Sequence, residues 1–289
     1  MRTCSVIAAM SDLWHQREYV RVAVQQDGWT LQYASEALKA DREVVLAAVQ
    51  QNAGALVYAA HALRADREVV LAAVQQDGSA LYYAAEALKA DREVVLAAVQ
   101  QDGWALSYAS MALKADHEIV LAAVQQDGHA LRFSTKALKA DRTIVLAAVQ
   151  QDALELYYAS MALKADREVV LTAVQQNGRA LACAASALKA DATIVTVAVR
   201  QNGRALEFAA PELKADKWLQ LLARRGSSRL PARVRAFLKL VRDQADAAVQ
   251  SKVDLFLIKR GLDDWISVKR ENTKARASKP PPHKRHKSV

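Results

Sequence analysis

The fold is decided by the stretch Asp91-Arg92-Glu93-Val94-Val95-Leu96-Ala97-Ala98-Val99-Gln100-Gln101-Asp102-Gly103, which continues as Trp104-Ala105-Leu106-Ser107-Tyr108-Ala109-Ser110-Met111-Ala112-Leu113-Lys114-Ala115. After 25 residues the pattern starts again, and it does so eight times without a slip in register. A fixed period of this length is typical of a stacked array of supersecondary units. The leading aspartates of the units are Asp41, Asp66, Asp91, Asp116, Asp141, Asp166, Asp191 and Asp216.

Each unit predicts a helix, a turn and a second helix. The aspartate is a good N-cap, because its carboxylate accepts hydrogen bonds from the free N–H groups of the first turn. We expect the first helix to end at Asp-Gly or Asn-Gly, where the glycine takes the left-handed conformation that closes a helix. Residues 81–89 then predict the second helix of their unit. Apolar residues recur at helical spacing and do not alternate with period two, so the fold class is all-α.

The helical spacing also predicts which side chains are buried. Residues 94–99 cover most of the circumference of the first helix, so we expect that helix to be buried on nearly all sides. Residues 152–156 lack the glycine, so their turn should be strained or reshaped. One unit alone buries too little apolar surface to offset its conformational entropy, which predicts a continuous α-solenoid. The predicted apolar stripe of the second helix, the outer one, is Ala105, Leu106, Ala109, Ala112 and Leu113.

The sequence divides into four regions. Gln16 stands where an aspartate is expected, so the tandem repeats span 16–215, and 1–15 is predicted to be an N-terminal cap or frayed segment. Residues 216–268 predict C-terminal capping helices, and the Pro/Lys/Arg-rich segment 269–289 predicts a disordered basic tail. Residues 1–215 hold 21 Lys/Arg against 24 Asp/Glu, whereas the remaining 19 Lys/Arg face only 7 Asp/Glu. The formal charge of +9 therefore belongs to the C-terminal quarter.

The repeat pattern resembles a known family. The unit reads Asp-x-Glu-Val-Val-Leu-x-Ala-Val-x-Gln-Asp/Asn-Gly-x-Ala-Leu-x-Tyr-Ala-x-x-x-Leu over residues 16–215. This pattern is similar to the repeats of the domain of unknown function 4116, DUF4116. The resemblance implies tandem helical hairpins and implies no activity.

Three positions of the unit vary freely from copy to copy: the residue after the glycine, the residue three places on, and the residue four places further. On one interpretation they form a solvent face on which drift is harmless. On the other they form a strip that binds an unidentified protein or peptide, because large apolar groups at exposed sites often anchor interfaces. We predict this second role, on the variable face of the second helices. The candidate partner-binding residues are Trp29, Tyr82, Trp104, Met111, Arg132, Tyr157 and Met161.

The basic tail carries an alternative function. Its Lys279, Lys284, Arg285 and Lys287 fit a contact with nucleic acid or an acidic surface, or a nuclear-localisation signal, although a solubilising tail has the same composition. A role of the repeats in reading nucleic acid is disfavoured, because residues 1–215 have a net charge of −3. Residues 65–78 recur as 90–103, so a recently duplicated array without a selected ligand is a third hypothesis.

The sequence predicts a non-enzymatic repeat scaffold. The six histidines fall at unrelated repeat positions without metal-ligand spacing, so neither a metal nor another cofactor is expected. The first ten residues hold too short an apolar stretch for a signal peptide, and no apolar run is long enough to span a membrane. Cys4 and Cys183 stand alone and favour a reducing compartment. We therefore expect an intracellular monomer, cytoplasmic or nuclear.

Overall fold

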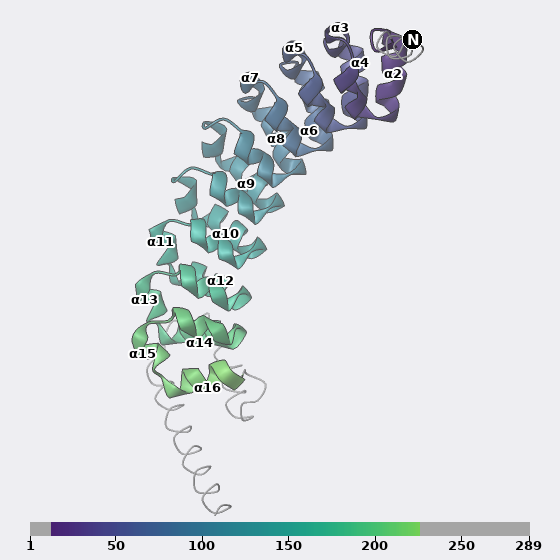
Figure 1. Cartoon of the computed structure of the whole chain (residues 1–289). Coiled ribbons are helices and arrows are strands. Elements are labelled where there is room, and N and C mark those ends of the chain that lie inside the picture. The colour runs from purple at the N-terminus through teal and green to yellow at the C-terminus, as the bar shows by residue number, and fades with distance from the viewer. Residues whose placement is uncertain (1–12, 226–289) are drawn as a thin grey trace, which may run out of the picture.

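The computed structural model describes residues 13–225, which form a curved stack of short helices (Figure 1). No strand occurs in this range, and the tandem 25-residue units follow one another in register. The all-α solenoid predicted from the sequence is therefore confirmed. Residues 1–12 and 226–289 lie outside the described range, and with them the predicted disordered tail and most of the predicted C-terminal cap.

The first helix of each unit lies toward the inner side of the curved stack, and the short helices lie along its outer side (Figure 1). The first helices span ten residues in eight units and nine residues in the last. They are α2 (Arg17–Gln26), α4 (Arg42–Gln51), α6 (Arg67–Gln76), α8 (Arg92–Gln101), α9 (His117–Gln126), α10 (Arg142–Gln151), α12 (Arg167–Gln176), α14 (Ala192–Gln201) and α16 (Lys217–Arg225).

The predicted single second helix is wrong, because it is broken in two. A 3-10 helix comes first, and a short α-helical or 3-10 segment follows after a residue such as Ala109, which is extended at φ −63°, ψ 156°. The first pieces are η1 (Gly28–Tyr33), η2 (Ala53–Tyr58), η3 (Gly78–Tyr83), η4 (Gly103–Tyr108), η6 (Gly128–Phe133), η8 (Ala153–Tyr158), η9 (Gly178–Cys183) and η10 (Gly203–Phe208). The second pieces are α3 (Glu36–Lys39), α5 (His61–Arg64), α7 (Glu86–Lys89), η5 (Leu113–Ala115), η7 (Leu138–Ala140), α11 (Met161–Lys164), α13 (Ser186–Lys189) and α15 (Pro211–Lys214).

Bonds between neighbouring units explain the break in the second helix. The residue that follows the extended alanine turns its N–H away from its own unit. Ser110 donates to Lys89 O at 2.8 Å, and Ala85 donates to Arg64 O at 2.8 Å. A continuous helix would use these N–H groups internally, so the break lets the backbone itself join one unit to the next.

The aspartate caps behave as predicted. Asp91 accepts from the N–H groups of Glu93 and Val94 at 3.0 and 3.1 Å, and the equivalent pairs recur from Asp41 to Asp216. The second aspartate or asparagine of the unit is a cap as well. Asp102 ends α8 in an extended conformation, and its Oδ1 accepts from Trp104 N–H to begin η4.

The predicted role of the turn glycine is wrong. None of the seven glycines in residues 13–225 has a left-handed φ. The glycine is needed because the next unit approaches its backbone: a Cβ on Gly78 would lie 2.3 Å from Ala98 O. Gly103 faces Ala123 O in the same way, at 2.5 Å. The small residue thus sets how closely successive units stack.

Alanine takes the glycine position in two units, at Ala53 and Ala153. The prediction that the turn at Asp152 is strained or reshaped is wrong, since its φ −140° and ψ 119° are ordinary extended values close to those of Asp102. The change is instead in packing between units: α6 packs less closely against η2, and α12 against η8, than α8 packs against η3.

The core is a continuous column of small and branched side chains. Val94, Val95, Ala98 and Val99 are buried, as are their equivalents in the other units, whereas Leu96 and Ala97 are half-buried. The first helix therefore keeps one face partly open, contrary to the prediction that it is buried on nearly all sides. In the predicted outer stripe, the buried residues are Ala105, Leu106, Ala109 and Leu113, but Ala112 is exposed because the chain breaks after Ala109.

Charged and amide side chains join the units along two edges. Arg67 contacts Asp91 at 3.3 Å and also Glu93, and the equivalent arginines repeat this bridge along the stack. On the other edge, the second glutamine of the unit reaches back across the junction. Gln201 accepts from Gly178 N–H at 2.6 Å and donates to Gln176 O at 2.9 Å.

Both described ends of the stack are covered. At the N-terminal end, the Trp14 ring lies 5.3 Å from the rings of Tyr19 and Tyr33. At the other end, α16 begins at the capping aspartate Asp216 and buries Trp218, Leu219 and Leu222. None of the helices in residues 13–225 is long and apolar enough to span a bilayer.

We expect acid to unfold the array. The pKa of Asp91 lies below its ordinary value of 3.8 because Val94 N–H donates to the carboxylate and Arg67 lies beside it, in spite of partial burial. Asp116 shows the same shift through Ile119 N–H. A lowered folded pKa contributes stability that is fully present above pH 3.8 and is lost as the pH falls through the folded value. Urea unfolding between pH 6 and pH 2 should show this decline, and a constant free energy of unfolding below pH 4 would contradict it.

Candidate functional site

The variable strip is made of the residue after the glycine position in each unit, the residue three places on, and the residue four places further. All seven predicted partner-binding residues lie on it and are exposed. Tyr157 is 64% exposed and Met161 is 72% exposed. Of the ten large apolar side chains that are exposed in residues 13–225, seven lie on the variable strip. They are Trp29, Tyr82, Trp104, Met111, Leu154, Tyr157 and Met161.

A column of aromatic side chains lies beside the variable strip. Its rings are half-buried except that of Tyr33, which is exposed. Trp104 contacts Phe133 of the next unit at 5.3 Å between ring centroids, and Tyr82 contacts Tyr108 at 5.2 Å. An aromatic residue recurs at this position every 25 residues in the first six units. The column consists of Tyr33, Tyr58, Tyr83, Tyr108, Phe133 and Tyr158.

Arg132 connects aromatic side chains at the centre of the variable strip. Its guanidinium lies 5.6 Å from the Trp104 ring, 5.3 Å from Phe133 and 5.9 Å from Tyr158. Tyr157 contacts Tyr158 at 5.1 Å. Trp104, Arg132 and Tyr157, from three successive units, therefore meet through rings of the column. Trp29 makes its ring contact with Tyr58, and Tyr82 makes its contacts with Tyr83 and Tyr108, so these groups are separate from the central one.

The two methionines occupy the last of the three strip positions in their units. Met161 begins α11, and Met111 occupies the equivalent place before η5. A lysine side chain connects this part of the unit to the preceding 3-10 helix through a hydrogen bond. Lys114 Nζ donates to Ser107 O at 2.7 Å, and partial burial lowers the pKa of its ammonium group. Met111 is thus exposed on a segment that is hydrogen-bonded to the preceding 3-10 helix.

A second cluster lies at the junction between η6 and η8, and the sequence analysis missed it. His129 Nδ1 lies 2.6 Å from Glu155 Oε1, and one atom each of His129, Glu155 and Asp152 lie within 4.8 Å of one another. Glu155 is only 4% exposed, and this burial raises the pKa of its carboxyl, although His129 opposes the shift. The sequence held one signal: Glu155 occupies a position where six of the other seven units have alanine and the first unit has Thr30.

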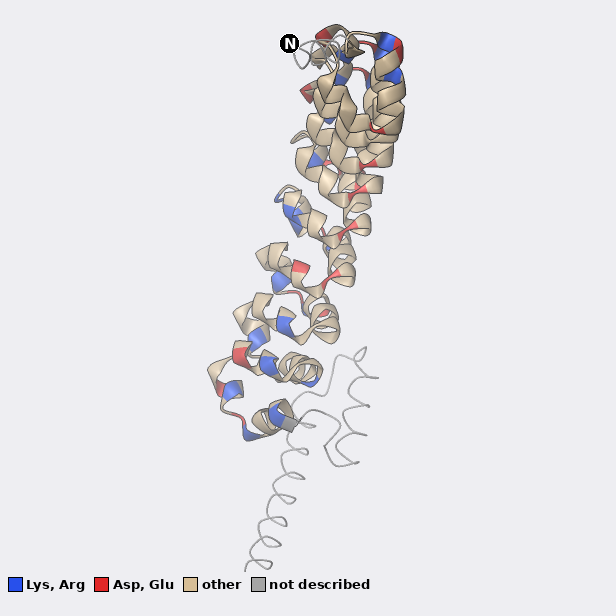
Figure 2. Cartoon of the chain, turned by 45° about the vertical axis from the view of Figure 1, so that its right-hand side comes forward, with Lys and Arg blue, Asp and Glu red and all other residues tan. Residues whose placement is uncertain are grey.

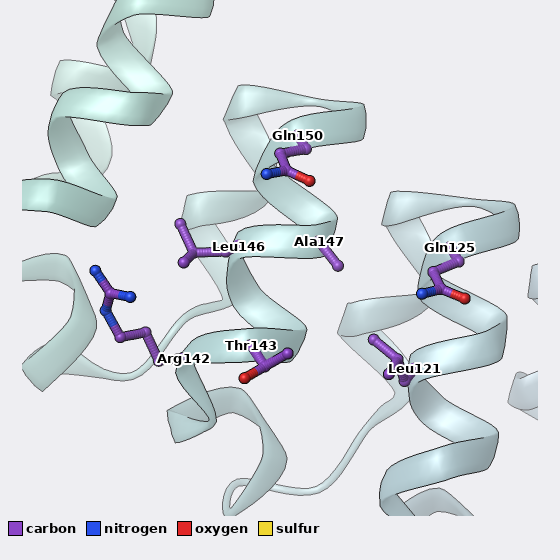
Figure 3. Close-up of a pocket in the computed structure, with 7 residues that line it drawn as sticks. All are labelled: Leu121, Gln125, Arg142, Thr143, Leu146, Ala147 and Gln150. Atoms are coloured by element: carbon purple, nitrogen blue, oxygen red, sulfur yellow. The ribbon is translucent and has the colours of Figure 1, made fainter.

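The long helices carry a shallow depression of about 330 Å³ (Figure 3). Leu121 and Gln125 line it from α9, and Arg142, Leu146 and Gln150 are among the residues that line it from α10. The leucine and glutamine positions have the same residues in the neighbouring units, for example Leu96 and Gln100. The depression is therefore an ordinary valley between adjacent helices, and it brings no distinctive chemistry together.

Charges of both signs are spread along the described array (Figure 2). Basic segments are more frequent in its C-terminal half, where Arg132, Arg179 and Arg204 occupy the variable strip. The strip also carries Glu36, Glu86 and Glu207. It is not a uniformly basic surface. The predicted tail residues Lys279, Lys284, Arg285 and Lys287 lie outside the described residues.

These features define a tandem helical repeat protein of the α-solenoid class, with a variable exposed strip on an otherwise repetitive scaffold. The comparison with protein families agrees with this class: the family model described as "Domain of unknown function (DUF4116)" matches seven overlapping segments between residues 16 and 214. The chain belongs to the DUF4116 family. No curated protein and no solved structure matches the chain. The matched segments are 16–64, 51–89, 66–114, 91–139, 116–164, 141–189 and 166–214.

Proposed function

We propose that this protein is a non-enzymatic scaffold that binds a protein or peptide partner along the variable strip. The observation that carries the proposal is the concentration of exposed apolar side chains on that strip, where seven of the ten in the described residues are found. Drift on a solvent face would leave mostly polar residues there. Exposed apolar groups gathered on one surface are typical of interaction sites.

The centre of the strip has the composition of a binding hot spot. Trp104, Arg132 and Tyr157 are the three residue types that contribute most often to interface energy. Their shared contacts with Phe133 and Tyr158 hold them in place before a partner arrives. Preorganised side chains lose less entropy on binding, so this group supports an anchor for a partner's apolar side chains.

The charge of the repeats favours a protein partner over nucleic acid. A groove that follows a phosphate backbone is strongly basic. Residues 1–215 carry a net charge of −3, and Glu86 lies on the same strip as Arg132. Nucleic-acid binding through the basic tail is the alternative, and it predicts a steep salt dependence that disappears when residues 269–289 are deleted.

The test compares the intact protein with a variant in which Trp29, Tyr82, Trp104 and Tyr157 are changed to alanine. Partners captured from lysate with the intact protein are identified, and the affinity of each is then measured with purified components. Hot-spot residues contribute about 2 kcal/mol each, so the variant should lose affinity by at least about 30-fold. The loss should persist at high salt, because the contacts are apolar.

A matched control changes four exposed glutamines on the long helices to alanine, namely Gln75, Gln100, Gln125 and Gln150. This control alters as many surface side chains and should bind with unchanged affinity. Circular dichroism establishes that both variants stay folded. A photo-crosslinking residue placed at position 157 should label the partner, whereas one at position 100 should not. Equal binding by the two variants would refute the proposal.

A further inference from the structure

We propose that His129, Asp152 and Glu155 form a binding site for a divalent transition-metal ion such as Zn²⁺. The three residues come from two successive units and meet at the junction between η6 and η8. Their ligand atoms lie within 4.8 Å of one another. In residues 13–225 this is the one group of three or more such side chains close enough to hold a metal ion.

The buried carboxylate carries the argument. Glu155 is 4% exposed, and its Oε1 contacts His129 Nδ1 at 2.6 Å. Its Oε2 is buried without a hydrogen-bond partner in the described residues. A buried carboxylate oxygen without a partner is costly, and such groups in proteins are usually paired or coordinate a metal. The equivalent positions Ala130 and Ala180 show that the fold itself needs only an alanine here.

The preceding junction shows how the geometry arises. There, Trp104 Nε1 donates to Asp127 Oδ2 at 2.7 Å, so the residue after the glycine reaches the capping carboxylate of the next unit. His129 and Asp152 occupy the same two positions one unit further on. Asp152 caps Leu154 N–H through Oδ1 at 2.8 Å, which leaves Oδ2 to face a ligand. Among the junctions in residues 13–225, only this one adds a further carboxylate beside the His129 and Asp152 positions, because Glu155 stands where the neighbouring units have alanine.

The donor set suits a transition metal. Imidazole nitrogens and carboxylate oxygens are both zinc ligands, and a site with three protein ligands keeps a fourth position for water. Ligand atoms around a tetrahedral zinc ion are about 3.4 Å apart, so ligand atoms that lie within 4.8 Å of one another have to close by at most about 1.4 Å. A side-chain rotation achieves this. Asp127 Oδ1 accepts from His129 N–H at 2.9 Å, so its carboxylate adds negative charge close to the cluster, and this charge favours a cation.

The experiment uses the full chain, purified without a tag and stripped of metal. Zn²⁺ is titrated against a chromophoric chelator, and Co²⁺ is added separately so that its absorption spectrum reports the coordination geometry. We expect one ion per chain, a higher melting temperature with Zn²⁺, and intense tetrahedral bands with Co²⁺. Glu155→Ala and His129→Ala should each weaken binding by at least about 10-fold. Asp152→Asn should also weaken it, while keeping the cap that Asn52 and Asn177 provide in other units.

Two controls test the assignment. His117→Ala removes an exposed histidine that lies 3.5 Å from Asp141 and should leave binding unchanged. The double variant with His283→Ala and His286→Ala separates metal binding by the tail from binding at the proposed site. The proposal is overturned if no ion binds at one equivalent, if the Glu155→Ala and Glu155→Gln variants both bind as the intact chain does, or if binding disappears with the tail histidines. Equal competition by Ca²⁺ or Mg²⁺ would overturn the assignment to a transition metal.

Discussion

Replacing Gly78 with alanine is expected to lower the free energy of unfolding by about 2–3 kcal/mol, because the added methyl group overpacks a closed junction. A Cβ on Gly78 would lie 2.3 Å from Ala98 O and 3.0 Å from the Asp102 backbone nitrogen. These atoms belong to the last turn of α8, so the whole next unit has to move to relieve the contact. Urea unfolding of the variant measures the loss.

Two substitutions serve as controls for this result. Gly54→Ala adds the same methyl group one place later in the unit, where its neighbour is the side chain of Trp29 at 3.0 Å rather than backbone. That ring can move, and other units carry side chains at this position, so the cost should be small. Ala153→Gly tests whether the less closely packed junction between η8 and α12 closes when the methyl group is removed. If Gly78→Ala and Gly54→Ala change the stability equally, the close approach of backbones is not what requires the glycine.

The sequence alone was sufficient for the array and its caps. The 25-residue period fixes the number and order of the units, and the aspartate at each helix start has a local role that needs no tertiary information. Burial of Val94, Val95 and Val99 follows from their helical spacing. The exposure of Trp104 and Tyr157 followed from the same reasoning, because a position that varies between copies is seldom part of a shared core.

The break in the second helix could not be predicted in the same way. Residues 105–113 contain no proline or glycine, and their helix propensity is good. What breaks the helix is a bond to another unit, from Ser110 N–H to Lys89 O. The local sequence pattern does not show that this N–H group bonds to another unit. The glycine was misinterpreted for the same reason, since its requirement comes from Ala98 of the following unit and not from its own φ.

The cluster at Glu155 could not be predicted from the spacing of ligands within one segment of the sequence. His129 and Glu155 are 26 residues apart, close to one repeat period, and a stacked array brings such residues together across a junction. In a repeat protein, metal ligands are therefore better sought among residues whose separation is close to a whole number of repeat periods. A residue that departs from a buried consensus position, as Glu155 does, is the more useful signal, because the fold itself does not require the change.

Deleting one complete unit, residues 91–115, is expected to leave a shorter but cooperatively folded array. The deletion joins Ala90 to Asp116, so α9 takes the place of α8 against α6. The new junction keeps its chemistry: Arg67 meets Asp116 and Glu118 in place of Asp91 and Glu93, which are the same residue types. Gly78 then faces Ala123 O instead of Ala98 O. Denaturant unfolding should remain a single transition with a smaller m-value, because less surface is exposed.

A deletion of residues 91–113, which is two residues shorter than one complete unit, should behave very differently. It inserts Lys114 and Ala115 before the capping aspartate and turns α9 away from the groove that α8 fills. The buried side chains at the junction, among them Ile119 and Val120, would then be exposed, at a cost of roughly 2 kcal/mol each. The array should separate into two blocks that unfold independently, because each unit packs mainly against its neighbours. If both deletions unfold in one transition with the same stability, register between units is not what holds the solenoid together.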